Sequence, residues 1–293
     1  MTKLSRKLLI SVFTLAFALV TLGATTFAWF TLSGTVGVDE FELSTATGFG
    51  IEISADGINW GNSVTAAELG VNLATKMDAV TSTDGVSFKD LNKESMTSGF
   101  ITFNLHFRST TEDLKVYLGS ETETFSTPKS WTPDTTFTYR GVSQNPETPI
   151  DIFAADSLRI SFQEHTSDEF NDEEGLVTIW ELDPSDDDDK NVRLDNAFVT
   201  NDGLFMYWEA KGLPLSIAGH SLPTVVYDND DLGADTDNPN LLTLSETIDG
   251  ADNYYFGYLT VRIWLEGWDP DNFDAIFNSK FSVNLFFEVQ GAE

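Results

Sequence analysis

Apolar and polar residues alternate along much of this chain, which is the pattern of β-strands with one buried face. The alternation is clearest over residues 101–107, 259–265 and 281–289. Shorter strand-like runs occur at residues 49–54, 114–118, 158–162, 176–182, 204–209 and 222–227. About ten short strands separated by Gly, Pro, Asn and Asp predict an all-β fold, an antiparallel jelly-roll-like β-sandwich.

Two segments of the sequence favour a helix. Asp269 is a favourable N-cap and Pro270 suits the first helical position, so a short helix is expected between the last two strands. Apolar residues at helical spacing predict a second helix over residues 65–80. We find no convincing internal repeat. Long acidic loops, which we interpret as elaborations of one scaffold, cover residues 168–174, 183–190 and 228–240.

The first thirty residues follow a different pattern. Three basic residues precede an uncharged apolar run at residues 8–22, and small residues follow it as far as Ala28. This order is typical of a secretory signal peptide, so we expect cleavage by a signal peptidase after Ala28. The alternative is an uncleaved anchor, because apolar character continues through Trp29 and Phe30.

Cleavage implies a secreted or cell-surface protein that contacts the membrane only through its signal segment. The expected division is a signal peptide at residues 1–28, an N-terminal strand at 29–47 and a single β-sandwich domain at 48–293.

Composition narrows the choice of partners. With 47 acidic and 16 basic residues the net charge is −31, which argues against nucleic acid, because phosphate neutralisation requires clustered Lys and Arg. A hydrophobic content of 41% is too high for a disordered chain, so the acidic surface must cover a core. The absence of cysteine excludes disulfides and thiolate metal sites.

Recognisable catalytic motifs are absent from the sequence. The chain has three histidines, and none stands in a His-Glu-x-x-His frame or at the spacing of a zinc-ligand pair. There is no nucleophile elbow, phosphate-binding glycine loop or dinucleotide fingerprint. With 47 acidic residues, some carboxylate pair always has the spacing of a glycosidase, so that signal carries no information. We therefore expect a non-enzymatic protein, with a secreted hydrolase as the weakest alternative.

One acidic loop is a candidate calcium site. Residues 228–237 supply closely spaced Asp and Asn oxygens, which suit Ca²⁺. The loop departs from the EF-hand pattern because Leu232 stands at the fifth position and Pro239 at the twelfth. The alternative is a solvated acidic loop. The candidate calcium ligands are Asp228, Asp230, Asp231, Asp235 and Asp237.

The segment after the expected cleavage site is rich in aromatic and β-prone residues. An aromatic N-terminus exposed to water is unfavourable, so we expect it to pair with a sheet. It either forms the first strand of its own sandwich or adds to a neighbouring copy or a related secreted subunit. The candidate assembly residues are Trp29, Phe30, Leu32, Val36, Val38, Phe41 and Leu43.

The junction at residues 24–31, Ala-Thr-Thr-Phe-Ala-Trp-Phe-Thr, resembles that of the TasA/camelysin-like secreted proteins of Gram-positive bacteria, which carry a SipW-type signal peptide. Residues 258–271 and 281–285 are similar to exported proteins with that signal type. The resemblance implies a jelly-roll subunit of an extracellular fibre or matrix, whose N-terminal strand complements the next subunit. Camelysin-like relatives have been described as metalloproteases, but the zinc-ligand pattern is absent here, so that activity is not transferred.

Together these patterns predict an exported structural protein of the cell surface or extracellular matrix. We expect a fibre or pilus-like subunit that assembles by β-strand addition. The alternative is a secreted adhesin or carbohydrate-binding module, which would stack sugar rings on exposed tryptophans. The candidate platforms for that alternative are Trp131, Trp180, Trp208 and Trp268.

Overall fold

The computed structural model describes residues 14, 36–45, 50–72, 76–171, 175–182, 198–213, 215–223, 226–235, 237–245, 247 and 253–290. Contacts divide the chain into two units, Met1–Gly34 and Thr35–Glu293. Apart from Thr14, every described residue belongs to the second unit. No helix within the described ranges is long and apolar enough to cross a membrane. The expected cleavage site after Ala28 lies outside the described residues.

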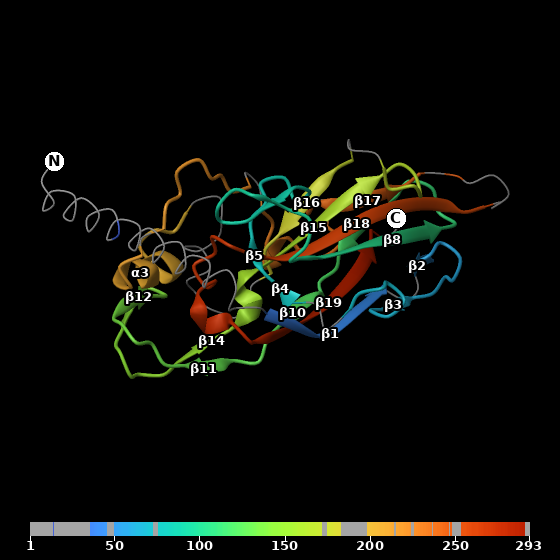
Figure 1. Ribbon diagram of the computed structural model, residues 1–293. Coiled ribbons are helices and arrows are strands. Elements are labelled where there is room, and N and C mark those ends of the chain that lie inside the picture. Colours follow the sequence, from blue (N-terminus) through green and yellow to red (C-terminus); the bar gives the residue numbers. More distant parts are fainter. Residues whose placement is uncertain are drawn as a thin grey trace, which may run out of the picture. The chain divides into compact units, whose positions relative to one another are not determined.

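Two β-sheets build the second unit (Figure 1). In the first sheet the strand order is β17 (Asn240–Leu244), β9 (Leu114–Leu118), β19 (Lys280–Val289), β1 (Val36–Thr45) and β3 (Ser63–Thr65). Two short strands add to this sheet: β10 (Glu123–Phe125) pairs with β19, and β4 (Lys76–Met77) pairs with β1. The second has the order β16 (Val177–Trp180), β15 (Leu158–His165), β18 (Tyr255–Glu266), β8 (Ile101–Ser109) and β2 (Ile51–Ser54), with β5 (Ala79–Val80) also beside β18.

Smaller elements extend the two sheets. Two short hairpins pair β6 (Phe88–Lys89) with β7 (Ser95–Met96) and β12 (Phe137–Tyr139) with β13 (Val142–Gln144). A third two-stranded sheet pairs β11 (Lys129–Trp131) with β14 (Ile150–Ile152) across the β12–β13 hairpin in the sequence. The helical elements are α3 (Gly203–Ala210) and the short 3₁₀ helices η1 (Ala154–Ser157), η2 (Asn229–Asp231) and η3 (Asp274–Ile276).

The inner faces of the two sheets pack against each other. Phe103 of β8 meets Phe41 of β1 with ring centroids 5.2 Å apart, and Phe107 of β8 meets Phe287 of β19 at 5.1 Å. Both ring pairs are edge to face, the favourable geometry for aromatic side chains. The mostly β architecture is consistent with the predicted sandwich, and its three clearest predicted strands are β8, β18 and β19.

The sandwich is not wholly antiparallel, which corrects the sequence prediction. β1 runs parallel to β19, beside which it lies in Figure 1, and β5 runs parallel to β18. Period-two alternation reports which face of a strand is buried but not the direction of its neighbour. The parallel pairing of β1 with β19 therefore could not be predicted from the local alternation of apolar and polar residues.

A β-bulge keeps the apolar side chains of β1 on one face. Val38 pairs with Phe281 and Phe41 pairs with Val283, so three steps along β1 match two steps along β19. The register shifts at Asp39, and both Val38 and Phe41 are buried. Without the extra residue, one of these two side chains would point to solvent.

Two predicted elements are wrong, and a third starts later than expected. Residues 204–209, expected as a strand, form α3, where Asp202 accepts a hydrogen bond from the Gly203 amide at 2.8 Å. Periodicity cannot separate a buried helix from a strand in so short an apolar run. The helix expected over residues 65–80 is replaced by a turn that reaches Gly70 at φ +69°, followed by β4 and β5. The helix expected after Asp269 starts later, as η3.

The strand expected at residues 222–227 is reduced, within its described part, to one bridge. Tyr227 makes an isolated parallel bridge to Trp180 of β16. Residues 224 and 225 lie outside the described ranges, as do the whole of the predicted acidic loop at 183–190 and part of that at 168–174.

Candidate functional site

The N-terminal strand β1 is held on both sides by strands of its own chain. Its residues from Gly37 to Thr45 pair with Lys280 to Phe287 of β19. On the other side, Glu42 to Ser44 pair with β3, and Val36 and Gly37 pair with β4. No described strand pairs with the stretch from Val38 to Phe41 on that side.

Four of the predicted assembly residues lie in the core of the second unit. Val36 and Leu43 are fully buried, and Val38 and Phe41 are 4% and 6% exposed. The structure thus places them in the chain's own sandwich, one of the two outcomes left open by the sequence. The other predicted assembly residues, Trp29, Phe30 and Leu32, lie outside the described residues.

The outer side of β1 is acidic. Asp39, Glu40 and Glu42 are exposed, and Asp39 Oδ1 lies 2.6 Å from Lys280 Nζ. Both members of this ion pair are more than half exposed, so it contributes little to stability. The strand therefore combines an apolar inner row with a charged outer row, as expected for a strand that covers a core.

A hollow of about 370 Å³ adjoins the start of β1 and β19. Phe125 of β10, 55% exposed, lines it together with Pro128 and Lys280. Lys129 also lines the hollow, and its ammonium group donates to the main-chain oxygen of Phe277. This hydrogen bond ties the loop after β10 to the chain that leads into β19.

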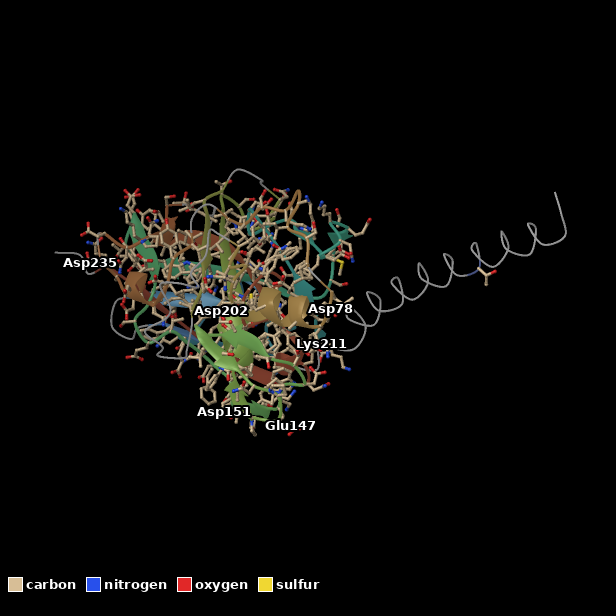
Figure 2. All side chains as sticks on the ribbon, turned by 90° about the vertical axis from the view of Figure 1, so that its left-hand side faces the viewer. Asp78, Glu147, Asp151, Asp202, Lys211 and Asp235 are labelled. Carbon is tan, nitrogen blue, oxygen red and sulfur yellow. The ribbon has the colours of Figure 1, made fainter. Side chains whose placement is uncertain are left out.

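The carboxylates of the predicted calcium loop face main-chain amides of the same loop. Asp228 caps η2 and accepts a hydrogen bond from the Asp230 amide at 2.7 Å, and Asp231 accepts one from the Asp228 amide at 3.0 Å. Asp235 accepts a weaker one from the Asp237 amide at 3.2 Å. Figure 2 shows Asp235 at one edge of the molecule. Within the described ranges no three His, Asp or Glu residues gather as a metal-binding group.

A cluster of buried charges surrounds Arg159 on β15. Its guanidinium lies 2.7 Å from Glu181 Oε1 and 3.1 Å from Asp269 Oδ2, and the pairs are at most 6% exposed. Burial lowers the pKa of Arg159, but Glu181 and Asp269 outweigh that effect and raise it. Arg159 is therefore charged at any physiological pH and holds the segment after β18 against β15.

Glu266, at the end of β18, lies beside this cluster. It is 2% exposed and accepts hydrogen bonds from the Trp264 indole at 3.1 Å and the Trp268 amide at 3.2 Å. Burial raises the pKa of Glu266 above its ordinary value, although Arg159 acts in the opposite direction. The cluster holds more carboxylates than guanidinium groups, and its contacts fix the segment that follows β18.

Three of the four tryptophans predicted as sugar platforms are buried, and Trp131 is partly exposed. Trp180, Trp208 and Trp268 are buried, at most 7% exposed. Trp131 packs edge to face against Tyr207 at 5.5 Å, within an aromatic cluster beside α3, whose first and last turns lie near Asp202 and Lys211 in Figure 2. Burial corrects the choice of Trp180, Trp208 and Trp268 as platforms, because large aromatic side chains are needed in the core of the sandwich.

A repeated loop was missed by sequence reasoning. Ser-x-Asp-Gly followed by an aliphatic, a polar and an aromatic residue occurs at residues 54–60 and again at 82–88. In both copies the serine hydroxyl donates to the aspartate, at 2.9 and 3.1 Å, and accepts from the glycine amide, at 3.0 and 2.9 Å. A search for short identical turn motifs would have found it.

The two copies differ in what covers their aromatic residue. Phe88, in the second copy, is buried beneath Phe100, which stacks on it at 4.0 Å. Trp60, in the first copy, is only partly buried and contacts Phe256 and the Arg108 guanidinium. Trp60 borders a second hollow, of about 230 Å³.

Comparisons of the chain with protein-family models, with curated proteins and with solved structures found no significant match.

Proposed function

We propose that this protein is a secreted, non-enzymatic structural subunit of the cell surface or extracellular matrix, built on a jelly-roll-like sandwich. Copies assemble when β1 of one copy occupies the place of β1 in the next. The observation that carries this proposal is the position of β1, a terminal strand held between β19 on one side and β3 and β4 on the other.

Strand exchange follows from how β1 is attached. Its partner β19 lies at the opposite end of the sequence, and all the contacts between them are non-covalent. Every copy carries the same contact surfaces, so β1 of a second copy makes the same hydrogen bonds and fills the same apolar positions. Residues 46–50 link β1 to β2, and this link would run between copies after exchange.

The apolar row of β1 makes an empty site costly. Full burial of one Val, Leu or Phe side chain contributes about 1.5–3 kcal/mol, so Val36, Val38, Phe41 and Leu43 together contribute roughly 6–12 kcal/mol. This is comparable to the net stability of a typical domain, about 5–15 kcal/mol. Every copy therefore needs a β1 strand in this position, either its own or that of a neighbouring copy. Exchange between folded copies is slow, because β1 must first leave its buried site.

The net charge of −31 opposes close approach of copies. The exposed Asp39, Glu40 and Glu42 place part of that charge on β1 itself. Salt screens such repulsion between exposed groups over about 8 Å at physiological ionic strength. Assembly should therefore accelerate with added salt, and Ca²⁺ bound by the loop at residues 228–237 would act in the same direction.

Removal of the exchanging strand tests the proposal. The mature protein and a variant without residues 29–45 are compared by electron microscopy and analytical ultracentrifugation. We expect filaments or oligomers from the mature protein and none from the variant, which should instead bind a synthetic peptide of residues 35–45. Assemblies that persist without this strand would contradict strand exchange.

A further inference from the structure

Trp60 borders a small hollow on the surface of the first repeated loop. The hollow measures about 230 Å³ and is lined by Asp56, Asn59, Ser63, Val64 and Glu68 in addition to Trp60. Pockets for drug-sized ligands measure about 300–1,000 Å³, so this one suits a single ring. An indole side by side with hydroxyl, amide and carboxylate groups is the composition of a site for a hydroxyl-rich ring.

The indole of Trp60 is held in place before any ligand arrives. Its Nε1 donates to the main-chain oxygen of Gly57 at 3.1 Å, and Phe256 packs edge to face against it at 5.8 Å. The Arg108 guanidinium stacks 4.4 Å from its centroid. Arg108 does not line the hollow, so it does not cover the side of the Trp60 indole that faces the hollow. A platform that is already ordered loses little entropy on binding.

Arg108 is itself fixed by two further contacts. It lies between Trp60 and Tyr254, 4.4 Å from the centroid of each ring, and its guanidinium is 2.7 Å from Glu52. The indole is thus backed by a chain of contacts that runs through Arg108 on β8 to Glu52 on β2. The hollow consequently has a rigid wall, although it lies in a loop.

The polar groups around the hollow are mainly open acceptors. Glu68 accepts hydrogen bonds from the Thr65 amide and hydroxyl through Oε2, which leaves Oε1 for a ligand. The amide nitrogen of Asn59 donates to Asp56 at 2.7 Å, which leaves Oδ1 of Asn59. The Ser63 side chain is exposed and adds a hydroxyl. Acceptors of this kind select a ligand that carries several O–H donors.

Electrostatics excludes acidic ligands from the hollow. Hydrogen bonds from the Asn59 and Ile58 amides lower the pKa of Asp56, and those from Thr65 lower the pKa of Glu68. Both carboxylates are therefore ionised at neutral pH, and the whole chain is strongly negative. Uronic acids, sialic acids and phosphorylated polymers would be repelled.

We propose that the hollow beside Trp60 binds one ring of a saccharide without acidic groups. One face of the ring lies against the indole, and its hydroxyls donate to Glu68 Oε1, Asn59 Oδ1 and Ser63. The internal repeat supports this assignment, because the aromatic residue of the second copy, Phe88, is covered by Phe100, whereas Trp60 has no such cover. This inference does not depend on strand exchange.

The test uses the full mature chain on an array of neutral and acidic glycans, followed by calorimetric titration of the neutral saccharide that binds best. Trp60→Ala should weaken the affinity about tenfold or more. Glu68→Gln should weaken it about tenfold, since it removes a charged acceptor. Ile58→Ser is the matched control, because Ile58 is in the same loop, is 79% exposed and does not line the hollow.

Binding of neutral glycans that is lost in the Trp60 and Glu68 variants and kept in the Ile58 variant supports the assignment. The Glu68 side chain is exposed, so its substitution tests the site even if Trp60→Ala impairs folding. No binding of any neutral glycan by the wild-type chain would overturn the proposal, and so would binding that survives both substitutions.

Discussion

Phe41 on β1 lies opposite Val283 on β19, which places the first and last strands of the sandwich side by side and parallel. Parallel pairing requires a long connection, and here the whole sandwich serves as that connection. The chain therefore closes its first sheet only after its last strand has formed. Such a late, non-local contact is slow to form, which gives a second copy time to supply its own β1.

The bulge at Asp39 gives the first prediction. Deletion of Asp39 removes the extra residue, so Val36 and Val38 must face solvent or the pairing with β19 must shift. Exposure of two valines should cost about 3 kcal/mol or more of unfolding free energy. Asp39→Ser keeps the residue count and should cost less than about 1 kcal/mol. Denaturant unfolding of both variants checks this, and equal stabilities would refute the role of the bulge.

Arg159 gives the second prediction. Arg159→Met leaves Glu181 and Asp269 buried without their cation, which should destabilise the protein by roughly 3–5 kcal/mol. Lys280→Ala breaks the exposed pair with Asp39 and should cost less than about 1 kcal/mol. Urea unfolding curves measure both. A small effect of the arginine substitution would mean that the buried cluster is not held by charge.

Glu266 gives a pH prediction. Its pKa in the folded chain is raised above the ordinary value of 4.5, so the native state binds its proton more tightly than the unfolded state. The stabilisation from this group is complete below that ordinary value and is lost as pH rises through the folded pKa. Glu266→Gln should therefore flatten the fall of unfolding free energy above pH 4.5. Chemical unfolding at several pH values compares the slopes, and identical slopes would contradict the assignment.

The second repeated loop gives a packing prediction. Gly85 has φ +71°, and an added Cβ would lie 2.8 Å from the Cβ of Ser161. Gly141 has φ +67° and open space around the same position. Alanine at Gly141 should cost about 1–2 kcal/mol from the backbone alone, and at Gly85 about 1–3 kcal/mol more from overpacking. Thermal unfolding compares them, and equal shifts would show that the loop does not press on β15.

Local alternation predicted the strands of the sandwich well, and non-local features poorly. β8 and β19 stand out in the sequence because one face of each is buried and the other is polar, and β18 stands out by its alternation although it is buried on both faces. Residues 204–209 could not be identified as a helix from the sequence, because their apolar side chains are buried around most of α3 and show no single apolar face. The direction of β1 relative to β19 could not be predicted, because apolar and polar residues alternate in the same way in parallel and antiparallel strands.

The candidate sites were predicted less completely than the fold. Val36, Val38, Phe41 and Leu43 were chosen because their segment is rich in aromatic and β-prone residues, and all four are buried in the structure. Trp60 was overlooked because tryptophan content alone does not report exposure. The turn that positions it depends on the carboxylate of Asp56, whose local hydrogen bonds are visible in sequence only as a short repeated motif.

A reversible covalent lock tests the central claim most directly. The chain has no cysteine, so Glu42→Cys with Asn284→Cys would join β1 to β19 across directly paired positions. The matched control, Glu123→Cys with Asn284→Cys, joins β10 to β19 and leaves β1 free. Both variants are imaged by electron microscopy, oxidised and then reduced. Strand exchange predicts that the oxidised β1 lock stays monomeric and assembles after reduction, while the control assembles in both states. Filaments from the oxidised β1 lock would contradict it.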